Sequence, residues 1–165
     1  MRCYVALGAN LGDPVAVVTA AIEALRQLPA SKMAKASSLY RTAPVGLLRQ
    51  PDFINAVVAL ELSDAVPSAS TLLDRLFSIE ARFGRERSIR NAPRTLDLDL
   101  LLFGDVVSTD LQCTLPHPRM HERAFVLAPL VEIEPALVVP GHGAAAELLV
   151  RCAEQTIARL PLVSD

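Results

Sequence analysis

The chain has 165 residues, of which 52% are hydrophobic, a composition that supports a folded core and excludes a disordered chain. We therefore expect a single domain over residues 1–165. A formal net charge of −2 argues against nucleic-acid binding, and no apolar run approaches the roughly 20 residues that span a bilayer. The three cysteines are widely spaced and the first residues lack a secretory signal, so we expect a reduced protein in the cytoplasm. We also expect the protein to be a monomer.

The first third of the chain alternates between strand and helix patterns. Residues 2–8 predict a short apolar strand, and Asp13 predicts the cap of a helix over residues 14–28. Gly8 and Gly12 lie between the two elements. Their spacing matches neither the dinucleotide fingerprint nor the phosphate loop, so it favours a plain strand-to-helix turn.

A second strand is predicted over residues 32–42, and a third over Phe53–Leu62. The nine-residue segment 43–51 between them is either a functional loop or a passive crossover. Phe53 and Asn55 share one face of the third strand. An amide in so apolar a strand needs a partner, which is either a backbone group or the edge of a ligand.

A helix over residues 68–83 carries Glu80 on the shoulder of its apolar stripe. Such a carboxylate usually reaches solvent or an arginine, but it could accept hydrogen bonds from a ligand. The segment 84–94 that follows is rich in arginine and is either a solvated basic loop or a cationic flap. Its arginines are Arg85, Arg87, Arg90 and Arg94.

The stretch from Pro93 to Gly104 contains a buried strand that two aspartates interrupt. Because side chains alternate along a strand, Asp97 and Asp99 leave the same face, roughly 7 Å apart at their Cα atoms. The predicted opposite face consists of Leu96, Leu98, Leu100 and Leu102. The pair is either simple polar alternation or an oxygen-donor site, which favours Mg²⁺ over Zn²⁺. An arginine-rich loop next to a magnesium site is suited to a polyphosphate.

The last third predicts a β-hairpin over residues 106–115 and helices over 124–134 and 144–160. His117 and His121 are four residues apart, but the intervening Pro118 argues against a helix that presents both to zinc.

Several motifs, taken together in order and spacing, resemble the 6-hydroxymethyl-7,8-dihydropterin pyrophosphokinases of folate biosynthesis. They are A-L-G-A-N-L-G-D at the start, S-S-L-Y-R-T-A-P-V-G at 37–46, Q-P-D-F-I-N-A-V at 50–57, P-R-T-L-D-L-D-L-L-L-F-G at 93–104 and L-P-H-P-R-M-H-E-R-A-F-V-L at 115–127. The resemblance implies a ferredoxin-like α+β sandwich, with a mainly antiparallel sheet flanked by helices. It also implies transfer of the terminal diphosphate of ATP to the pterin hydroxymethyl group, which releases AMP.

The same resemblance assigns roles to residues. Asp97 and Asp99 match the ligands of two Mg²⁺ ions, and the matched ATP contacts are Glu80, Arg85, Arg94, His117 and Arg123. Thr42, Pro44, Val45, Phe53, Asn55 and Phe125 match the residues around the pterin. This chain departs from the family in lacking Trp, with Asn91 near the position where members often carry it, and in having Phe53 where Tyr is common.

Two other functions fit parts of the pattern. A nucleotidyltransferase also uses a D-x-D strand with nearby arginines, but it would release pyrophosphate and would not explain the grouping of Phe53, Asn55 and Phe125. A non-catalytic module would bind nucleotide or pterin without turnover. The kinase interpretation explains more of the chain than either.

Overall fold

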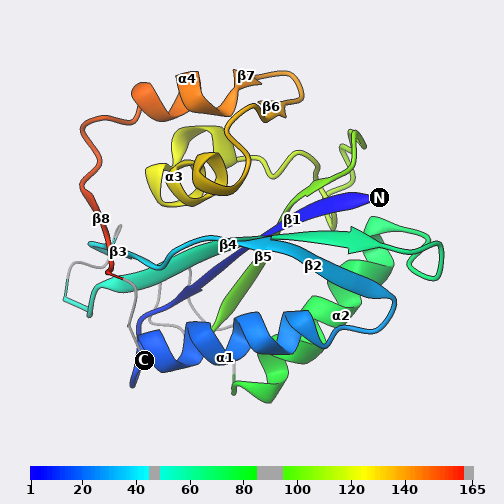
Figure 1. Cartoon of the computed structure of the whole chain (residues 1–165), viewed down its shortest axis with the longest axis horizontal. Coiled ribbons are helices and arrows are strands. Elements are labelled where there is room, and N and C mark those ends of the chain that lie inside the picture. Colours follow the sequence, from blue (N-terminus) through cyan, green and yellow to red (C-terminus); the bar gives the residue numbers. More distant parts are fainter. Residues whose placement is uncertain (45–48, 85–94, 162–165) are drawn as a thin grey trace.

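The structure is a computed structural model and describes residues 1–44, 49–84 and 95–161. Its centre is a six-stranded antiparallel sheet in the order β5-β1-β4-β3-β8, with β2 pairing to the other end of β4 (Figure 1). The strands are β1 (Arg2–Ala9), β2 (Ser31–Ala36), β3 (Tyr40–Thr42), β4 (Phe53–Leu62), β5 (Asp97–Phe103) and β8 (Ile157–Arg159).

Helices cover both faces of this sheet. Figure 1 shows α1 (Pro14–Arg26) and α2 (Ala69–Arg82) on one face, and α3 (Ala124–Ile133) on the other with α4 (Ala145–Val150) outside it. A short 3₁₀ helix, η1 (Met120–Glu122), precedes α3, and the strand pair β6 (Val138–Val139) and β7 (Gly143–Ala144) precedes α4. When β2 and β3 are counted as one interrupted strand, the elements from β1 to β5 follow the β-α-β-β-α-β order, which confirms the predicted ferredoxin-like sandwich. Among the described helices, none is long and apolar enough to cross a membrane.

Local chemistry explains where the first two helices begin. The Asp13 side chain accepts a hydrogen bond from the Ala16 amide at 3.1 Å, with Pro14 at the first helical position, as predicted. The Ser68 hydroxyl accepts one from the Thr71 amide at 3.2 Å at the start of α2. Each helix then buries one apolar stripe against the sheet.

Alternation along the strands divides the interior into two cores. Val5 of β1 and Ile54 of β4 face α1 and α2, whereas Ala6 and Val57 face α3. A β-bulge in β5 interrupts this alternation, because Tyr4 pairs with Leu102 but Val5 pairs with Leu100. The prediction that Leu102 shares a face with Leu96, Leu98 and Leu100 is therefore wrong, and Leu102 packs toward α3.

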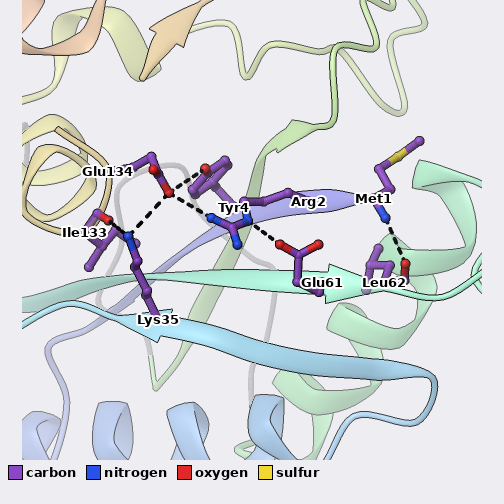
Figure 2. Close-up of polar contacts among 8 residues, drawn as sticks. All are labelled: Met1, Arg2, Tyr4, Lys35, Glu61, Leu62, Ile133 and Glu134. Carbon is purple, nitrogen blue, oxygen red and sulfur yellow. Dashed lines mark hydrogen bonds and ion pairs between the residues drawn. The ribbon is translucent and has the colours of Figure 1, made fainter. Parts of the chain in front are cut away.

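The C-terminal end of α3 is tied to the sheet by a polar network (Figure 2). Glu134 accepts hydrogen bonds from Arg2 at 3.0 Å and from the Tyr4 hydroxyl at 3.2 Å, and it lies 3.9 Å from the Lys35 ammonium. Lys35 also donates to the carbonyl of Ile133 at 2.8 Å. Because this end of α3 sits over the start of β1, its N-terminal end points toward the end of β1.

Three predicted elements differ from the structure. The strand over residues 32–42 is broken into β2 and β3, because Ser37 turns its side chain onto the Val57 amide at 2.9 Å. The hairpin over residues 106–115 is a single bridge between Ser108 and Leu115. The helix over residues 144–160 ends at Val150, and the chain then returns to the sheet as β8, which pairs with β3.

Candidate active site

The two aspartates of β5 lie on the face of the sheet that α3 covers. Asp97 is paired with Gly8 of the neighbouring strand β1, and Asp99 is paired with Ala6 of the same strand. The side chain of Ala6 belongs to the core beneath α3. Both aspartates are half-buried. The predicted common face is therefore confirmed, and two carboxylates stand together at the edge where β5 begins.

The segment after β5 folds back and places His117 beside these carboxylates. The His117 amide donates to the carbonyl of Leu101 at 2.9 Å, and its Nδ1 accepts a hydrogen bond from the Arg119 amide at 3.2 Å. Since Nδ1 is an acceptor, the neutral ring carries its proton on Nε2, which is left to donate to a ligand. Burial and the positive charge of Arg123 lower the pKa of His117 from 6.5 to about 4, although Asp97 acts in the opposite direction.

Arg123 approaches the same carboxylates from the start of α3. Burial and the charge of Arg119 lower the pKa of its guanidinium, while Asp99 and Asp97 raise it. The guanidinium carbon lies 5.5 Å from the centre of the Phe125 ring, a distance typical of a cation–π contact. The structure thus brings Asp97, Asp99, His117 and Arg123 together, as a site for a metal-bound phosphate requires.

A second cluster lies two strands away on the same face. Gly8 is paired with Asp97 on one side and with Asn55 on the other, and Tyr40 follows beyond Asn55. The Asn55 side-chain amide donates to the Thr42 hydroxyl at 2.9 Å, and both residues are buried. Asn55 therefore has a side-chain partner, a possibility that the sequence interpretation did not include. Its carbonyl oxygen lies only 3.1 Å from the point where a Cβ on Gly8 would stand.

The remaining candidates are placed around these two clusters. Pro44 follows β3 and is half-buried, Phe53 shares its face with Asn55, and Phe125 packs at the edge of the core beneath α3. Glu80 is 2% exposed, and its Oε1 accepts a hydrogen bond from the Leu98 amide at 2.8 Å. Val45, Arg85 and Arg94 lie outside the described residues.

Two residues that the sequence interpretation missed also shape this region. Gly8 leaves the sheet bare between Asp97 and Asn55, and Asn10 donates to Gln50 at 2.8 Å and to the carbonyl of Pro51 at 3.1 Å. Asn10 thereby attaches the end of the segment 43–51 to the strand that carries Gly8. The turn at residues 8–12 contains both residues, but its glycine spacing predicts only a plain connection.

The donor set determines which metal the site can hold. Among the described residues, no three His, Cys, Asp or Glu side chains form a complete metal-binding group. Two half-buried carboxylates beside cationic phosphate donors fit Mg²⁺, which binds one or two carboxylates and completes its shell with substrate oxygens and water. The residues therefore fit a magnesium ion that arrives with a phosphate ligand.

A family profile described as 7,8-dihydro-6-hydroxymethylpterin-pyrophosphokinase (HPPK) matches residues 4–135. The chain belongs to this family. It is 43% identical over 160 residues to a 2-amino-4-hydroxy-6-hydroxymethyldihydropteridine pyrophosphokinase from Pseudomonas aeruginosa, with 97% of each chain covered. The enzyme of the same name from Haemophilus influenzae is 41% identical over 160 residues, which cover 97% of this chain and 98% of that one.

A solved structure of the HPPK family shares the fold. A Plasmodium falciparum HPPK-DHPS aligns with a TM-score of 0.68 at 13% identity over 91% of this chain. The present chain spans 43% of that larger protein. As an HPPK, this protein transfers diphosphate from ATP to 6-hydroxymethyl-7,8-dihydropterin in folate biosynthesis. The predicted fold class and enzymatic activity are both confirmed.

Proposed function

We propose that Asp97 and Asp99 hold two Mg²⁺ ions together with the phosphates of ATP. The observation that carries this proposal is the convergence of both carboxylates with His117 and Arg123 on one face of the sheet. His117 and Arg123 then bind the phosphates as hydrogen-bond and charge donors. Arg85 and Arg94, which follow from the family resemblance, extend the same set, and Glu80 adds a nucleotide contact.

The pterin occupies the neighbouring cluster. Asn55 offers an amide edge to the heterocycle, and Phe53 and Phe125 are suited to the two faces of a flat ring. Thr42, Pro44 and Val45 complete the surroundings. Because Asp97 and Asn55 are separated by one strand, their Cα atoms are about 9–10 Å apart. A bicyclic ring bound at Asn55 can therefore extend its hydroxymethyl group to the carboxylates.

The reaction forms one bond and breaks another. The hydroxymethyl oxygen attacks the β-phosphorus of ATP, and the bond from that phosphorus to the oxygen bridging the α- and β-phosphates breaks, so AMP leaves. The hydroxyl proton passes to water. Mg²⁺ held by Asp97 and Asp99 would neutralise phosphate charge and acidify the attacking hydroxyl. His117 and Arg123 orient the phosphates, and the carboxylates hold both reactants in line.

Product analysis with aspartate variants tests this assignment. Asp97→Ala and Asp99→Ala should each lower the formation of AMP and pterin diphosphate by about a thousandfold or more, because the metal contributes several kcal/mol to the transition state. Asp105→Ala is the matched control, since Asp105 follows the same strand and is exposed. The variants are compared with wild type at equal, saturating ATP and pterin over a series of Mg²⁺ concentrations.

The products also separate the alternative reactions. Release of pyrophosphate in place of AMP would indicate nucleotidyl transfer, and intact ATP from folded protein would indicate a binding module. Full activity of the Asp97→Ala, Asp99→Ala double variant would refute the metal assignment. We further propose that residues 1–165 form one pyrophosphokinase domain, which acts as a monomer in the cytoplasm.

A further inference from the structure

The side chain of Gln155 forms hydrogen bonds with the backbone of the residues on either side of Arg123. Its Oε1 accepts a hydrogen bond from the Ala124 amide at 2.9 Å, and its Nε2 donates to the carbonyl of Glu122 at 2.8 Å. Gln155 lies between α4 and β8, where the chain returns from the outside of α3 to the sheet (Figure 1). It also lies beyond residues 4–135, the part of the chain that the HPPK profile matches.

The start of α3 needs such a partner. Arg123 is the cap residue of α3, and no side-chain cap hydrogen bond is made from this position. The first amides of a helix have no partner within the helix, and Ala124 is only 2% exposed, so water cannot easily serve its amide. A Ser or Asp at position 123 would cap only the second or third amide of the helix, not that of Ala124, and would remove the guanidinium. Gln155 supplies the acceptor from elsewhere in the chain.

The two hydrogen bonds also hold the backbone conformation of Arg123. Its φ of −118° and ψ of 110° are extended, and the amide of Gln155 spans the peptide groups on either side of it. This conformation directs the side chain over Phe125 and toward Asp97 and Asp99. We propose that Gln155 is a positioning residue for ATP binding, which acts by holding Arg123 in place to contact the phosphates. This inference rests on the proposed role of Arg123.

The test replaces Gln155 with Met, which keeps the length of the side chain and removes both hydrogen bonds. The KM for ATP should rise by about tenfold, the order of loss seen when the partner that orients a metal ligand is removed. The KM for the pterin, measured at saturating ATP, should stay within about twofold, because Asn55 is held by Thr42 and not by Gln155. Glu154→Ala is the matched control, since Glu154 is exposed and precedes Gln155.

A double-mutant cycle separates positioning from general damage. In an Arg123→Ala background, Gln155→Met should cause no further loss of ATP affinity. If Gln155→Met proves too unstable to assay, Gln155→Glu keeps the acceptor for Ala124 and should retain more ATP affinity than Gln155→Ala.

The outcomes distinguish this inference from the proposed function. Unchanged ATP affinity in Arg123→Ala would refute the role of Arg123 itself. A loss in Arg123→Ala with none in Gln155→Met would overturn only the positioning role. Equal losses for ATP and pterin in Gln155→Met would show that Gln155 supports the fold and not the ATP site.

Discussion

Glu80 connects α2 to the strand that carries the two aspartates, and its removal should weaken both stability and metal binding. Its carboxylate accepts a hydrogen bond from the amide of Leu98, which lies between Asp97 and Asp99 on β5. β5 is an edge strand of the described sheet and has β1 on one side only, so an amide on its outer side has no strand to bind. Leu98 is 2% exposed, and Glu80→Ala would leave its amide buried without this acceptor.

The size of the effect follows from that contact. A hydrogen bond to a charged group, or the cost of a buried amide without a partner, amounts to about 2–3 kcal/mol of unfolding free energy. For a chain of this length, the corresponding fall in Tm is roughly 4–12 °C. Glu80→Gln keeps an oxygen acceptor and should lose about half as much, because neutral hydrogen bonds are about half as strong as charge-assisted ones.

Urea unfolding of the metal-free, nucleotide-free protein measures the free energy of unfolding. A titration of turnover with Mg²⁺ measures the Mg²⁺ concentration that gives the half-maximal rate. We expect Glu80→Ala to need about tenfold more Mg²⁺ for half-maximal rate, since the aspartates on either side of Leu98 lose their alignment. Asp74→Ala, on the exposed side of the same helix, is the control. An unchanged urea midpoint for Glu80→Ala would refute the reasoning, because the buried amide would then have lost nothing.

Two further predictions concern Gly8 and His117. Gly8→Ala places a methyl group 3.1 Å from the Asn55 carbonyl oxygen, so it should raise the KM for pterin by about tenfold and leave the KM for ATP within about twofold. An equal change in both constants, measured in steady-state assays, would contradict this. His117 has a folded-state pKa of about 4, below its ordinary 6.5, so its contribution to stability is complete above pH 6.5 and is lost as the pH falls toward 4. Urea unfolding of metal-free protein at pH 7 and pH 4.5 should show that wild type loses about 2–3 kcal/mol more than His117→Gln. Parallel losses in the two proteins would mean that another group controls the acid sensitivity.

Local chemistry was enough to predict much of the fold. The cap at Asp13, the alternation along Phe53–Leu62 and the stripe of α2 each depend on neighbours within a few residues. The same holds for the common face of Asp97 and Asp99, because it follows from the geometry of a single strand. The site motifs could therefore be recognised, and their chemistry interpreted, before any tertiary contact was known.

The errors occur where the outcome depends on a distant partner. The pattern of residues 32–42 predicts one strand, but a hydrogen bond between the Ser37 hydroxyl and the Val57 amide interrupts that strand. Leu102 lies on the other face than predicted because β5 forms a bulge where it pairs with β1. The apolar residues of the segment 144–160 recur at helical spacing. The end of this segment nevertheless forms the strand β8, because β8 makes backbone hydrogen bonds with β3.

The candidate site shows the same division between local and distant determinants. The sequence, through its resemblance to the family, suggested residues for contacts with phosphate, metal and pterin, and these roles stay predictions. The residues that hold them were decided by the tertiary structure, because Gly8, Glu80 and Gln155 act through partners 47, 18 and about 31 positions away. No periodicity or local motif encodes such a contact. It arises because a buried amide or carboxylate must find a partner in whatever segment the fold brings beside it.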